Sequence, residues 1–428
     1  MFAPNVNMRR NLAFAFAFIL AMFMIAQLFV GPARTVQGVK DATHKVYKAT
    51  QQRPLSPTQS IQALWSSIKL PLTQRTYTDP DGKQFNLTQK PIWTKSLGKD
   101  VLIIDIDTRQ PTGYNQILNT TKLNWEKLGV GTYMDDNIGL TSSAIFNHYL
   151  YSQIHGYDYV FFQSKEIGYQ HHTWVKVHAI PEVLKNYKFV VFLDADVTVH
   201  HMEVPLEWLF NKWKITAQTS LALPQDVTRE GCDTCDSKGN VMLSSGVIVA
   251  QNIPHTHKIF DAWKACPNET LYPGCGQWAY SWAHEQRALS EFLRYDENMN
   301  PNQNILALPC DDANGYPEKN EVKPDGMIFY SDCQGNFFQH HWLDGGKRLT
   351  KKAIGESVMQ NIAEVVQKAI WDGQDTLVIN QTTEAQAEES AKPKPASDDQ
   401  CDLNSGVYTS QRKAAAAWGI LGARCSTA

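Results

Sequence analysis

Apolar residues form short, uninterrupted runs in the middle of the chain, and polar residues follow each run. Three runs are expected to form strands: Val101–Arg109, Tyr157–Phe162 and Phe189–Leu193. The first and the third have the pattern of strands that are buried on both faces of a sheet. Two segments between them repeat apolar residues at helical spacing: Ser142–His155 and Trp174–Leu184. Pro181 is expected to break the second helix. This order predicts a β-α-β-α-β unit with a parallel sheet.

The second half of the chain continues the pattern less regularly. Further strands are expected at Leu221–Leu223, Val241–Ala250, Ile305–Leu308, Met327–Tyr330 and Phe337–Trp342. Further helices are expected at Ile259–Ala265, Trp282–Leu293 and Lys351–Trp371. We therefore predict one α/β domain over residues 99–372. From Gly373 the chain becomes polar, and residues 373–428 are expected to form a linker and a C-terminal tail.

The N-terminal region has a different pattern. Asn11–Val30 contains no charged residue. A helix of this length is long enough to cross a hydrocarbon core of about 30 Å. Arg9 and Arg10 precede this span and favour a cytoplasmic N-terminus. We expect a cytoplasmic tail over residues 1–10 and a transmembrane signal-anchor over 11–31. The alternative is a cleaved signal peptide, whose apolar region is normally shorter. Residues 32–98, polar and rich in proline, are expected to form an irregular stem.

Composition and cysteine usage narrow the class of protein. The net charge of −3 and the scattered basic residues give no sign of nucleic-acid binding. All eight cysteines follow the apolar span, as do the four N-glycosylation sequons at Asn86, Asn119, Asn268 and Asn380. This distribution predicts a lumenal domain with disulfides, for which Cys266–Cys275 and Cys310–Cys333 are the expected pairs. Cys232 and Cys235 alone are half a zinc site, so zinc is not expected.

The strand Phe189–Leu193 leads into two carboxylates, Asp194 and Asp196. Ligand sites in open α/β sheets lie beyond the carboxyl ends of such strands. Hard oxygen ligands suit Mn²⁺ or Mg²⁺, which keep open positions for substrate phosphates. The pattern therefore indicates a metal site that holds the diphosphate of a nucleotide-sugar. The alternative is that the two aspartates only cap a strand–loop turn.

A second pair of carboxylates, Asp105 and Asp107, is an internal rival for the metal site. Arg109 is close enough in sequence to neutralise one of these carboxylates. We interpret the strand that carries Asp105 as the nucleotide-edge strand, with its tip near the base and ribose. Neighbouring residues of a strand point to opposite faces, so at most one member of each histidine pair reaches the site. A structural or exposed role is expected for His171, His172, His200 and His201.

Five motifs occur in an order that resembles a known family. They are NHYLYSQIHGYDYVFF, TWVKVHAIPEVLKNYKFVVFLDADVTVHH, LSSGVIVAQN, HEQRALSEFL and FFQHHW. In this order they are similar to fungal type II membrane glycosyltransferases of family 34, which include α-galactosyltransferases and α-mannosyltransferases, and to the related plant xyloglucan xylosyltransferases. The resemblance covers Val101–Trp342. It implies a GT-A type nucleotide-sugar-binding domain with a Rossmann-like mixed sheet.

The resemblance also implies the residues of the site. The metal ligands would be Asp194, Asp196 and His340, with His341 as the adjacent rival. Lys176 and the Ser245–Gly246 pair match family positions near the donor. Lys176 would contact a phosphate, and Gly246 would let the backbone approach the donor sugar. Two positions depart from the family pattern. Ser244-Ser245-Gly246 replaces the usual Asn-Ser/Thr-Gly, and Glu285-Gln286 replaces the usual Asp-Gln.

Glu285 and Gln286 are the expected catalytic residues, because a carboxylate or amide oxygen stabilises an oxocarbenium-like sugar. Their expected helix would let Glu285 reach a cleft; the alternative is a solvent-facing helix surface. We predict a Golgi, single-pass type II hexosyltransferase that uses Mn²⁺ or Mg²⁺ and a UDP- or GDP-hexose, with galactose or mannose as the sugar. Its expected partners are a glycan acceptor and other glycosyltransferases. The alternatives are a non-catalytic lumenal subunit and a glycoside hydrolase.

Overall fold

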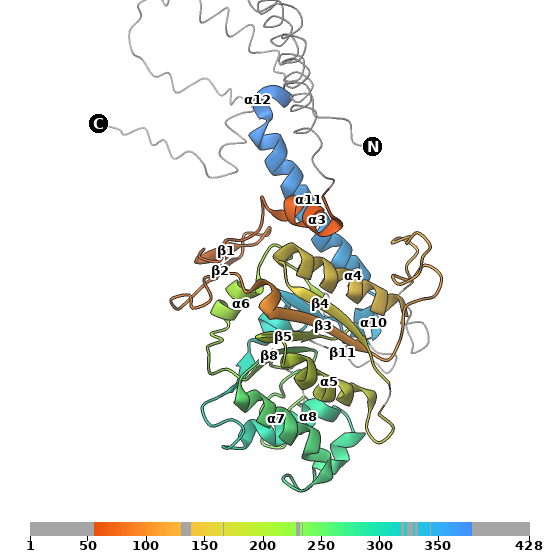
Figure 1. Cartoon of the computed structure of the whole chain (residues 1–428), viewed down its shortest axis with the longest axis vertical. Helices are drawn as coiled ribbons and strands as arrows, with labels where there is room; N and C mark the ends of the chain where they lie inside the picture. The colour runs from red at the N-terminus through yellow and green to blue at the C-terminus, as the bar shows by residue number, and fades with distance from the viewer. Residues whose placement is uncertain are drawn as a thin grey trace, which may run out of the picture. The chain divides into compact units, whose positions relative to one another are not determined.

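The computed structural model describes residues 55–129, 138–165, 167–227, 232, 234–317, 321–322, 328–329, 333–342 and 344–378 (Figure 1). Within these ranges, no helix has the length and apolar character needed to span a bilayer. The predicted cytoplasmic tail and signal-anchor lie outside the described residues, as do Asn380, Cys401 and Cys425. Contacts between residues divide the chain after Ala369, and the structure describes only residues 370–378 of the second unit.

A six-stranded mixed sheet forms the centre of the fold. Its strands, in spatial order, are β4 (Asp158–Gln163), β3 (Val101–Asp107), β5 (Phe189–Leu193), β8 (Val247–Gln251), β7 (Leu221–Pro224) and β9 (Ile305–Leu308). β3 pairs in parallel with β4 and with β5, and β7 pairs in parallel with β9. β8 runs antiparallel to both of its neighbours. The mixed α/β sheet confirms the predicted fold class, and its assignment to the GT-A type stays a prediction.

The strand directions bring two chain segments together at one edge of the sheet. β5 ends at Leu193, and the antiparallel β8 begins at Val247, which is the register partner of Leu193. The residues after β5 and the residues before β8 are therefore neighbours, and the Asp194 N–H donates a hydrogen bond of 2.9 Å to the Gly246 carbonyl. This edge is where the carboxyl ends of β3, β4 and β5 meet.

Helices cover both faces of the sheet, because successive strand residues point to opposite sides. On one side, Ile103 and Val191 pack in a cluster with residues of α4 (Ile138–His155). On the other side, Val190 and Phe192 pack with residues of three helices: α5 (Val175–Leu184), α7 (Pro254–Ala265) and α8 (His284–Glu291). Figure 1 shows α5, α7 and α8 together on this second side. Each fully buried Val, Leu or Phe contributes about 1.5–3 kcal/mol to such a core.

Most predicted elements form with small changes of boundary, and two expectations were wrong. Pro181 does not break α5, which continues to Leu184. An interior proline removes the bond to the carbonyl four residues earlier and crowds that carbonyl, but Ile180, Pro181 and Leu184 are all buried in α5, so burial of this helix face offsets the cost. β8 also starts at Val247 rather than at Val241, because residues 241–246 form the loop that approaches the end of β5.

A small second sheet extends the first. β6 (Val197–Val199) pairs antiparallel with β12 (Phe338–His340), and His340 is the register partner of Val197. Because of the β6–β12 pairing, His340, which lies near the end of the domain in sequence, is brought beside the Asp194–Asp196 turn.

Further elements do not belong to these two sheets. They are α6 (Leu206–Lys212), α9 (Cys310–Ala313), β10 (Glu321–Val322), β11 (Ile328–Phe329), α10 (Asp344–Lys347), α11 (Thr350–Asp372), α12 (Gln374–Leu377) and the 3-10 turns Gly98–Asp100, His172–Trp174, Cys266–Asn268, Cys275–Ala279 and Leu293–Tyr295.

Residues 55–97 do not form the irregular stem that their composition predicts. They contain α3 (Pro57–Trp65), β1 (Thr76–Thr78) and β2 (Gln84–Asn86). Trp65, Tyr77 and Phe85 from these elements are buried in the same cluster as the sheet residue Val191. Their buried apolar residues are few and widely spaced, so the sequence shows no periodic pattern, although these residues fill positions in the core of the domain.

Three disulfides are present among the residues that the structure describes. Cys266–Cys275 and Cys310–Cys333 confirm the predicted pairs. Cys232 and Cys235 also form a disulfide with each other, in agreement with the expectation that they are not half of a zinc site.

His155 at the end of α4 makes the stability of the domain depend on pH. Its Nε2–H donates to the Met202 carbonyl at 2.8 Å, and burial and the Lys69 charge lower the pKa of His155 from 6.5 to about 3. Between these values the unfolded chain binds a proton that the folded chain does not, so stability falls as the pH falls. We expect His155 to cost on the order of 2 kcal/mol of unfolding free energy at pH 5 relative to pH 7.5.

His155→Gln keeps an N–H donor but does not titrate. Urea unfolding at pH 7.5 and at pH 5 should therefore show a smaller loss of stability in the variant than in the wild-type protein. The same pH dependence in both proteins would contradict the assignment.

Candidate active site

Three side chains that can bind a metal converge at the edge of the sheet. Asp194 and Asp196 follow β5, and His340 ends β12. One possible ligand atom from each of them lies within 4.8 Å of the other two. His340 Nε2 is 3.3 Å from Asp196 Oδ1. Two carboxylates and one imidazole are a donor set that suits Mn²⁺ or Mg²⁺ with open positions left for a ligand.

The charges around the site also favour a bound cation. Burial lowers the pKa of His340, but the Asp196 carboxylate raises it by more, and the net direction is upward. The pKa of Asp196 is below its usual value, because the attraction of His340 outweighs the effect of burial. The carboxylates therefore attract the positive charge of a protonated His340, and a divalent cation bound at this place would supply a positive charge instead.

Gly246 leaves room for His340. A Cβ atom added at Gly246 would lie 2.3 Å from His340 Cε1 and less than 3 Å from both ring nitrogens. Real Cβ atoms do not approach other heavy atoms so closely, so this position admits only glycine while His340 keeps its place. The sequence suggested that Gly246 lets the backbone approach the donor sugar. In the structure it lets the backbone approach the imidazole.

Asn314 fixes the orientation of His340 from its other side. Asn314 Oδ1 is 3.1 Å from His340 Nδ1, and the His340 N–H donates to the Gly315 carbonyl at 2.9 Å. An N–H at Nδ1 that donates to Asn314 leaves the Nε2 lone pair for a metal. Sequence analysis missed Asn314, because nothing in its sequence neighbourhood marks it as a neighbour of His340.

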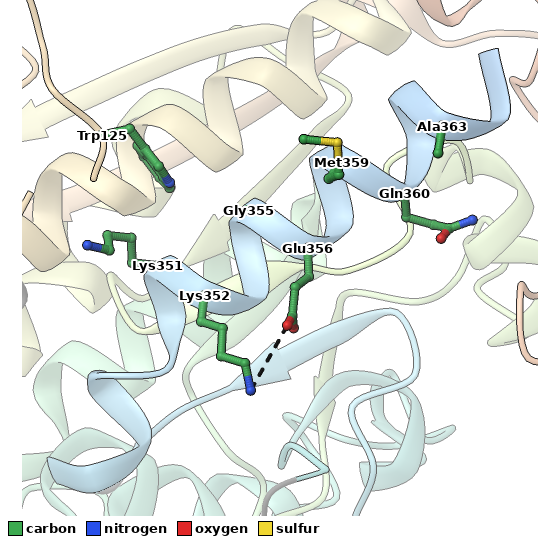
Figure 2. A pocket seen from close by; sticks show the side chains of 8 residues that line it. All are labelled: Trp125, Lys351, Lys352, Gly355, Glu356, Met359, Gln360 and Ala363. Carbon is green, nitrogen blue, oxygen red and sulfur yellow. Dashed lines mark ion pairs between the residues drawn. The ribbon is translucent and has the colours of Figure 1, made fainter. Parts of the chain in front are cut away.

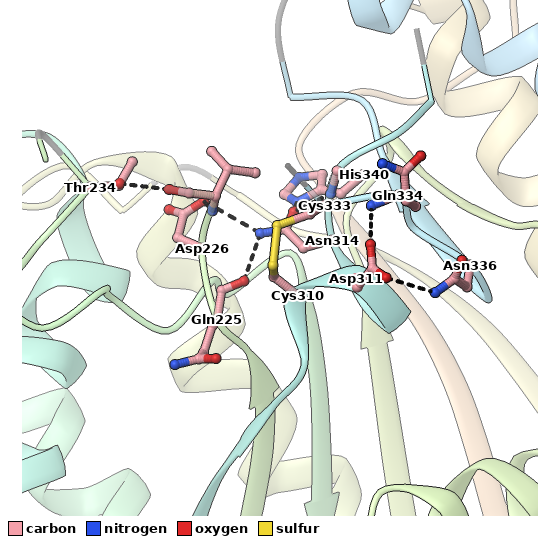
Figure 3. The surroundings of a disulfide bond; sticks show 12 residues. Gln225, Asp226, Thr234, Cys310, Asp311, Asn314, Cys333, Gln334, Asn336 and His340 are labelled. Carbon is pink, nitrogen blue, oxygen red and sulfur yellow. Dashed lines mark hydrogen bonds between the residues drawn. A yellow bond between two sulfur atoms is a disulfide. The ribbon is translucent and has the colours of Figure 1, made fainter. Parts of the chain in front are cut away.

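The disulfide Cys310–Cys333 joins the two segments that make this contact (Figure 3). Cys310 lies shortly before Asn314, and Cys333 lies shortly before His340. Asp311 strengthens the same connection, since its carboxylate accepts from the Gln334 N–H at 2.7 Å. The position of His340 therefore depends on this cross-link as well as on the pairing of β12 with β6.

Lys176 connects the metal site to Glu285. It extends from α5, is buried, and its ammonium lies 2.9 Å from Asp194 Oδ1 and 3.5 Å from Glu285 Oε1. It also donates to the Ser245 carbonyl at 3.2 Å. Burial lowers the pKa of Lys176, but the two carboxylates raise it by more. The predicted contact of Lys176 with a phosphate stays a prediction, and in the structure its charge is shared between two carboxylates.

Glu285 lies in the first turn of α8 and is buried rather than open to a cleft. Its Oε1 accepts from the Ser245 hydroxyl at 2.8 Å. Its Oε2 is buried and has no hydrogen-bond partner within the described ranges, although Thr173 is near enough to lower the pKa of Glu285. Burial raises this pKa, but the Lys176 charge and the hydrogen-bond donors Thr173 and Ser245 together lower it by more, and the net direction is downward. Glu285 is therefore a buried, ionised carboxylate whose Oε2 has no hydrogen-bond partner in the described part of the chain.

Gln286 faces a different set of partners. Its Oε1 accepts from the Ser245 N–H at 2.9 Å, and its Nε2 donates to Asp226 Oδ2 at 2.8 Å. Asp226 also contacts Asn314, whose Nδ2 lies 3.4 Å from Asp226 Oδ1. Asp226 thus links Gln286 to Asn314, the residue that orients His340. Sequence analysis did not select Asp226.

The rival carboxylates are occupied by other groups. Asp107 forms a two-pronged ion pair with Arg109, at 2.6 and 2.9 Å, as the sequence suggested. Asp105 is buried, with His148 Nδ1 2.5 Å from its Oδ1 and the Tyr159 hydroxyl on its other oxygen. Asp105 is thus held inside the sheet edge, and its predicted contact with the nucleotide stays a prediction.

His341 points away from the metal ligands, as expected for adjacent residues of a strand. Its Nε2 lies 3.3 Å from Thr198 Oγ1, and its ring stacks on Tyr316. Burial lowers the pKa of His341 to about 3.

A cavity elsewhere contains none of these residues. It has a volume of about 490 Å³ and lies beside α11, where Trp125, Gly355 and Met359 line it (Figure 2). The ion pair Lys352–Glu356 at 4.0 Å is at its edge. Because it holds neither the carboxylates nor the histidine, this cavity is not the predicted donor site.

A model of the galactosyl transferase GMA12/MNN10 family matches residues 129–340. This range contains all the candidate metal ligands. A search among curated proteins found no match.

Solved structures give weaker similarities. A glycosyltransferase involved in the glycosylation of the major capsid of PBCV-1 shares 11% identity over 59% of this chain and 98% of its own, with a TM-score of 0.36. The galactosyltransferase LgtC, in complex with donor and acceptor sugar analogs, shares 9% identity over 67% and 99%, with a TM-score of 0.31. GlyE of Streptococcus pneumoniae TIGR4 shares 14% over 62% and 64%, with a TM-score of 0.29. TM-scores below 0.5 do not establish a common fold.

Proposed function

We propose that this chain, which a model of the galactosyl transferase GMA12/MNN10 family matches over residues 129–340, is a hexosyltransferase that moves galactose or mannose from a UDP- or GDP-sugar to a glycan. The proposal includes a divalent metal, Mn²⁺ or Mg²⁺, at Asp194, Asp196 and His340, and retention of configuration at the sugar. The observation that carries it is the convergence of these three side chains beside the Lys176–Glu285 pair.

Two opposite charges develop during the reaction, one on the departing diphosphate and one on the sugar, and different residues of the site would stabilise each. A bound metal would stabilise the negative charge that develops on the departing diphosphate, with a contribution of several kcal/mol. Glu285 supplies an ionised oxygen for the positive charge that develops on the sugar. Lys176 holds Asp194 and Glu285 in one arrangement, and Gln286 is fixed by Ser245 and Asp226.

Hydrolysis of nucleotide-sugars by the purified full-length protein tests the proposal. We expect release of nucleoside diphosphate from UDP-galactose or GDP-mannose with Mn²⁺ present, loss of release with EDTA, and recovery with excess Mn²⁺. A non-catalytic subunit would release nothing under any condition. A glycoside hydrolase would cleave glycosides regardless of EDTA, because its two carboxylates need no metal.

The two adjacent histidines should respond differently to substitution. His340→Ala removes a metal ligand, so the Mn²⁺ concentration needed for half-maximal turnover should rise by about tenfold or more. His341→Ala removes a stack on Tyr316 and should leave the metal requirement close to that of the wild-type protein. Metal titrations of both variants measure this difference. Equal shifts, or a shift only in His341→Ala, would refute the assignment of His340.

We further propose that the chain is a Golgi type II membrane protein with its catalytic domain in the lumen. Two of the sequons, Asn86 and Asn268, are exposed in the structure and accessible for glycosylation. The native protein should therefore lose mass on endoglycosidase treatment, as measured by gel mobility. Unchanged mobility would count against a lumenal domain.

A further inference from the structure

Two loops meet directly beside Glu285. Residues 167–174 lead into α5, and residues 277–284 lead into α8. The His171 N–H donates to the Ala279 carbonyl at 2.8 Å, and the Tyr280 hydroxyl donates to the Gly168 carbonyl at 3.3 Å. These bonds hold the two loops as one surface, which ends at the residue before Glu285.

Imidazole rings form the inner part of this surface. His171 and His284 stack with ring centroids 3.6 Å apart and planes 8° from parallel, and the His172 ring lies 3.9 Å from His171. His284 immediately precedes Glu285, and its buried Nδ1 has no hydrogen-bond partner in the described part of the chain. The inner part therefore offers unused hydrogen-bonding capacity next to the predicted catalytic carboxylate.

Aromatic rings form the outer part. The exposed fractions are 67% for Tyr169, 61% for Tyr280 and 52% for Trp282. The Tyr280 hydroxyl bonds to Gly168, the residue before Tyr169, and Trp282 follows Tyr280 by two residues. Exposed aromatic residues on paired loops of this kind mark binding sites. Tyr and Trp provide a large, rigid contact area with a polar edge at a low cost in conformational entropy.

The charge of this surface limits what it can bind. Neither 167–174 nor 277–284 contains an Asp, Glu, Lys or Arg residue. Burial and the neighbours His172 and His284 lower the pKa of His171 to about 4, so it is neutral at neutral pH. The surface lacks the fixed positive charges that bind a phosphate and the ion pairs that orient a charged peptide. An uncharged molecule with both apolar faces and hydroxyl groups fits it best, and a sugar has this chemistry.

We propose that Tyr169, Tyr280 and Trp282, together with His171, His172 and His284, form an aromatic platform that binds the acceptor glycan. The inference rests on the proposed function, since it assigns the acceptor of the same reaction to a surface that adjoins Glu285. Pyranose rings stack on the exposed aromatic faces, and the imidazole nitrogens exchange hydrogen bonds with the sugar hydroxyls. The platform thereby directs an acceptor hydroxyl toward the Glu285 end of the site.

Kinetics with a separate readout for each substrate test the platform. The full-length protein is assayed with UDP-galactose and GDP-mannose as donors and with mannose and galactose di- to tetrasaccharides as acceptors. We expect Trp282→Ala to raise the acceptor KM by about tenfold or more, as for a truncated aromatic anchor. Trp282→Phe keeps a stacking face and should restore most of the affinity. Donor hydrolysis without acceptor reports whether the donor site of each variant is assembled.

Trp371→Ala is the matched control, because Trp371 is an exposed tryptophan on α11 (66%, against 52% for Trp282) that belongs to neither loop. Its acceptor KM should equal that of the wild-type protein. An unchanged acceptor KM in Trp282→Ala, or wild-type donor hydrolysis without transfer to any of these saccharides, would overturn the platform and leave the proposed function standing. Absence of both hydrolysis and transfer in the wild-type protein would instead overturn the proposed function and the platform with it.

Discussion

Donor turnover is expected to fall by about a thousandfold or more when Asp196 is replaced by asparagine, because a metal ligand of this kind supports several kcal/mol of transition-state stabilisation. Asn has nearly the shape of Asp but removes the charge that attracts both a cation and His340. Circular dichroism and thermal unfolding should show that Asp196→Asn still folds. Asp194→Asn should act in the same direction, and it also removes one of the two carboxylate charges that pair with Lys176.

Asp107→Asn is the matched control for this substitution. It removes the same charge from an aspartate that also follows an apolar strand, but its carboxylate is paired with Arg109. We expect its effect on donor turnover to be much smaller than that of Asp196→Asn. If Asp105→Asn and Asp107→Asn abolished turnover while Asp194→Asn and Asp196→Asn kept it, the metal site would belong to β3.

Gly246→Ala should weaken metal binding by between about tenfold and 100-fold, although it adds one methyl group. The new Cβ would overlap the His340 ring, which Asn314 and the β6–β12 pairing prevent from moving freely. Titration of donor hydrolysis with Mn²⁺ measures the effect. Gly355→Ala is a suitable control, because a Cβ at Gly355 meets nothing closer than 3.7 Å.

A double substitution shows whether the overlap with His340 is the cause. Once His340→Ala has removed the ring, Gly246→Ala should add little to the loss, so the two effects should be strongly non-additive. Additive effects would mean that Gly246 acts on the donor directly and not through His340.

The sequence predicts where the strands of this fold lie better than it predicts which side chains contact the site residues in space. Phe189–Leu193 and Ile305–Leu308 have the predicted boundaries. The first is a continuous apolar run that is buried on both faces as a central strand, whereas the second lies at the edge of the sheet and is only half buried. The placement of Asp194 follows from that prediction. The partner of Asp194 could not be predicted in the same way, since Lys176 lies on another element and its contact depends on how α5 packs on β5.

Residues that act through hydrogen bonds over long sequence distances were missed for the same reason. Asn314 and Asp226 have no periodic pattern or motif around them, and their roles come from the loops before β12 and after β7. Gly246 was selected, but for contact with a sugar rather than for contact with His340. A local pattern can indicate which residue types carry chemistry, but only the three-dimensional packing shows which of them meet.

The packing of residues 55–97 determines how the catalytic domain can be cut from the chain. A recombinant fragment that began at residue 99 would lose Tyr77, whose hydroxyl bonds to the buried carboxylate of Glu203. It would also lose Leu97, whose N–H donates to buried Glu207 at 2.6 Å. Two interior carboxylates would then lack these donors, and the places of Trp65 and Phe85 would be open to water. A soluble fragment should therefore begin before Pro57, so that α3, β1 and β2 stay with the core cluster to which they contribute.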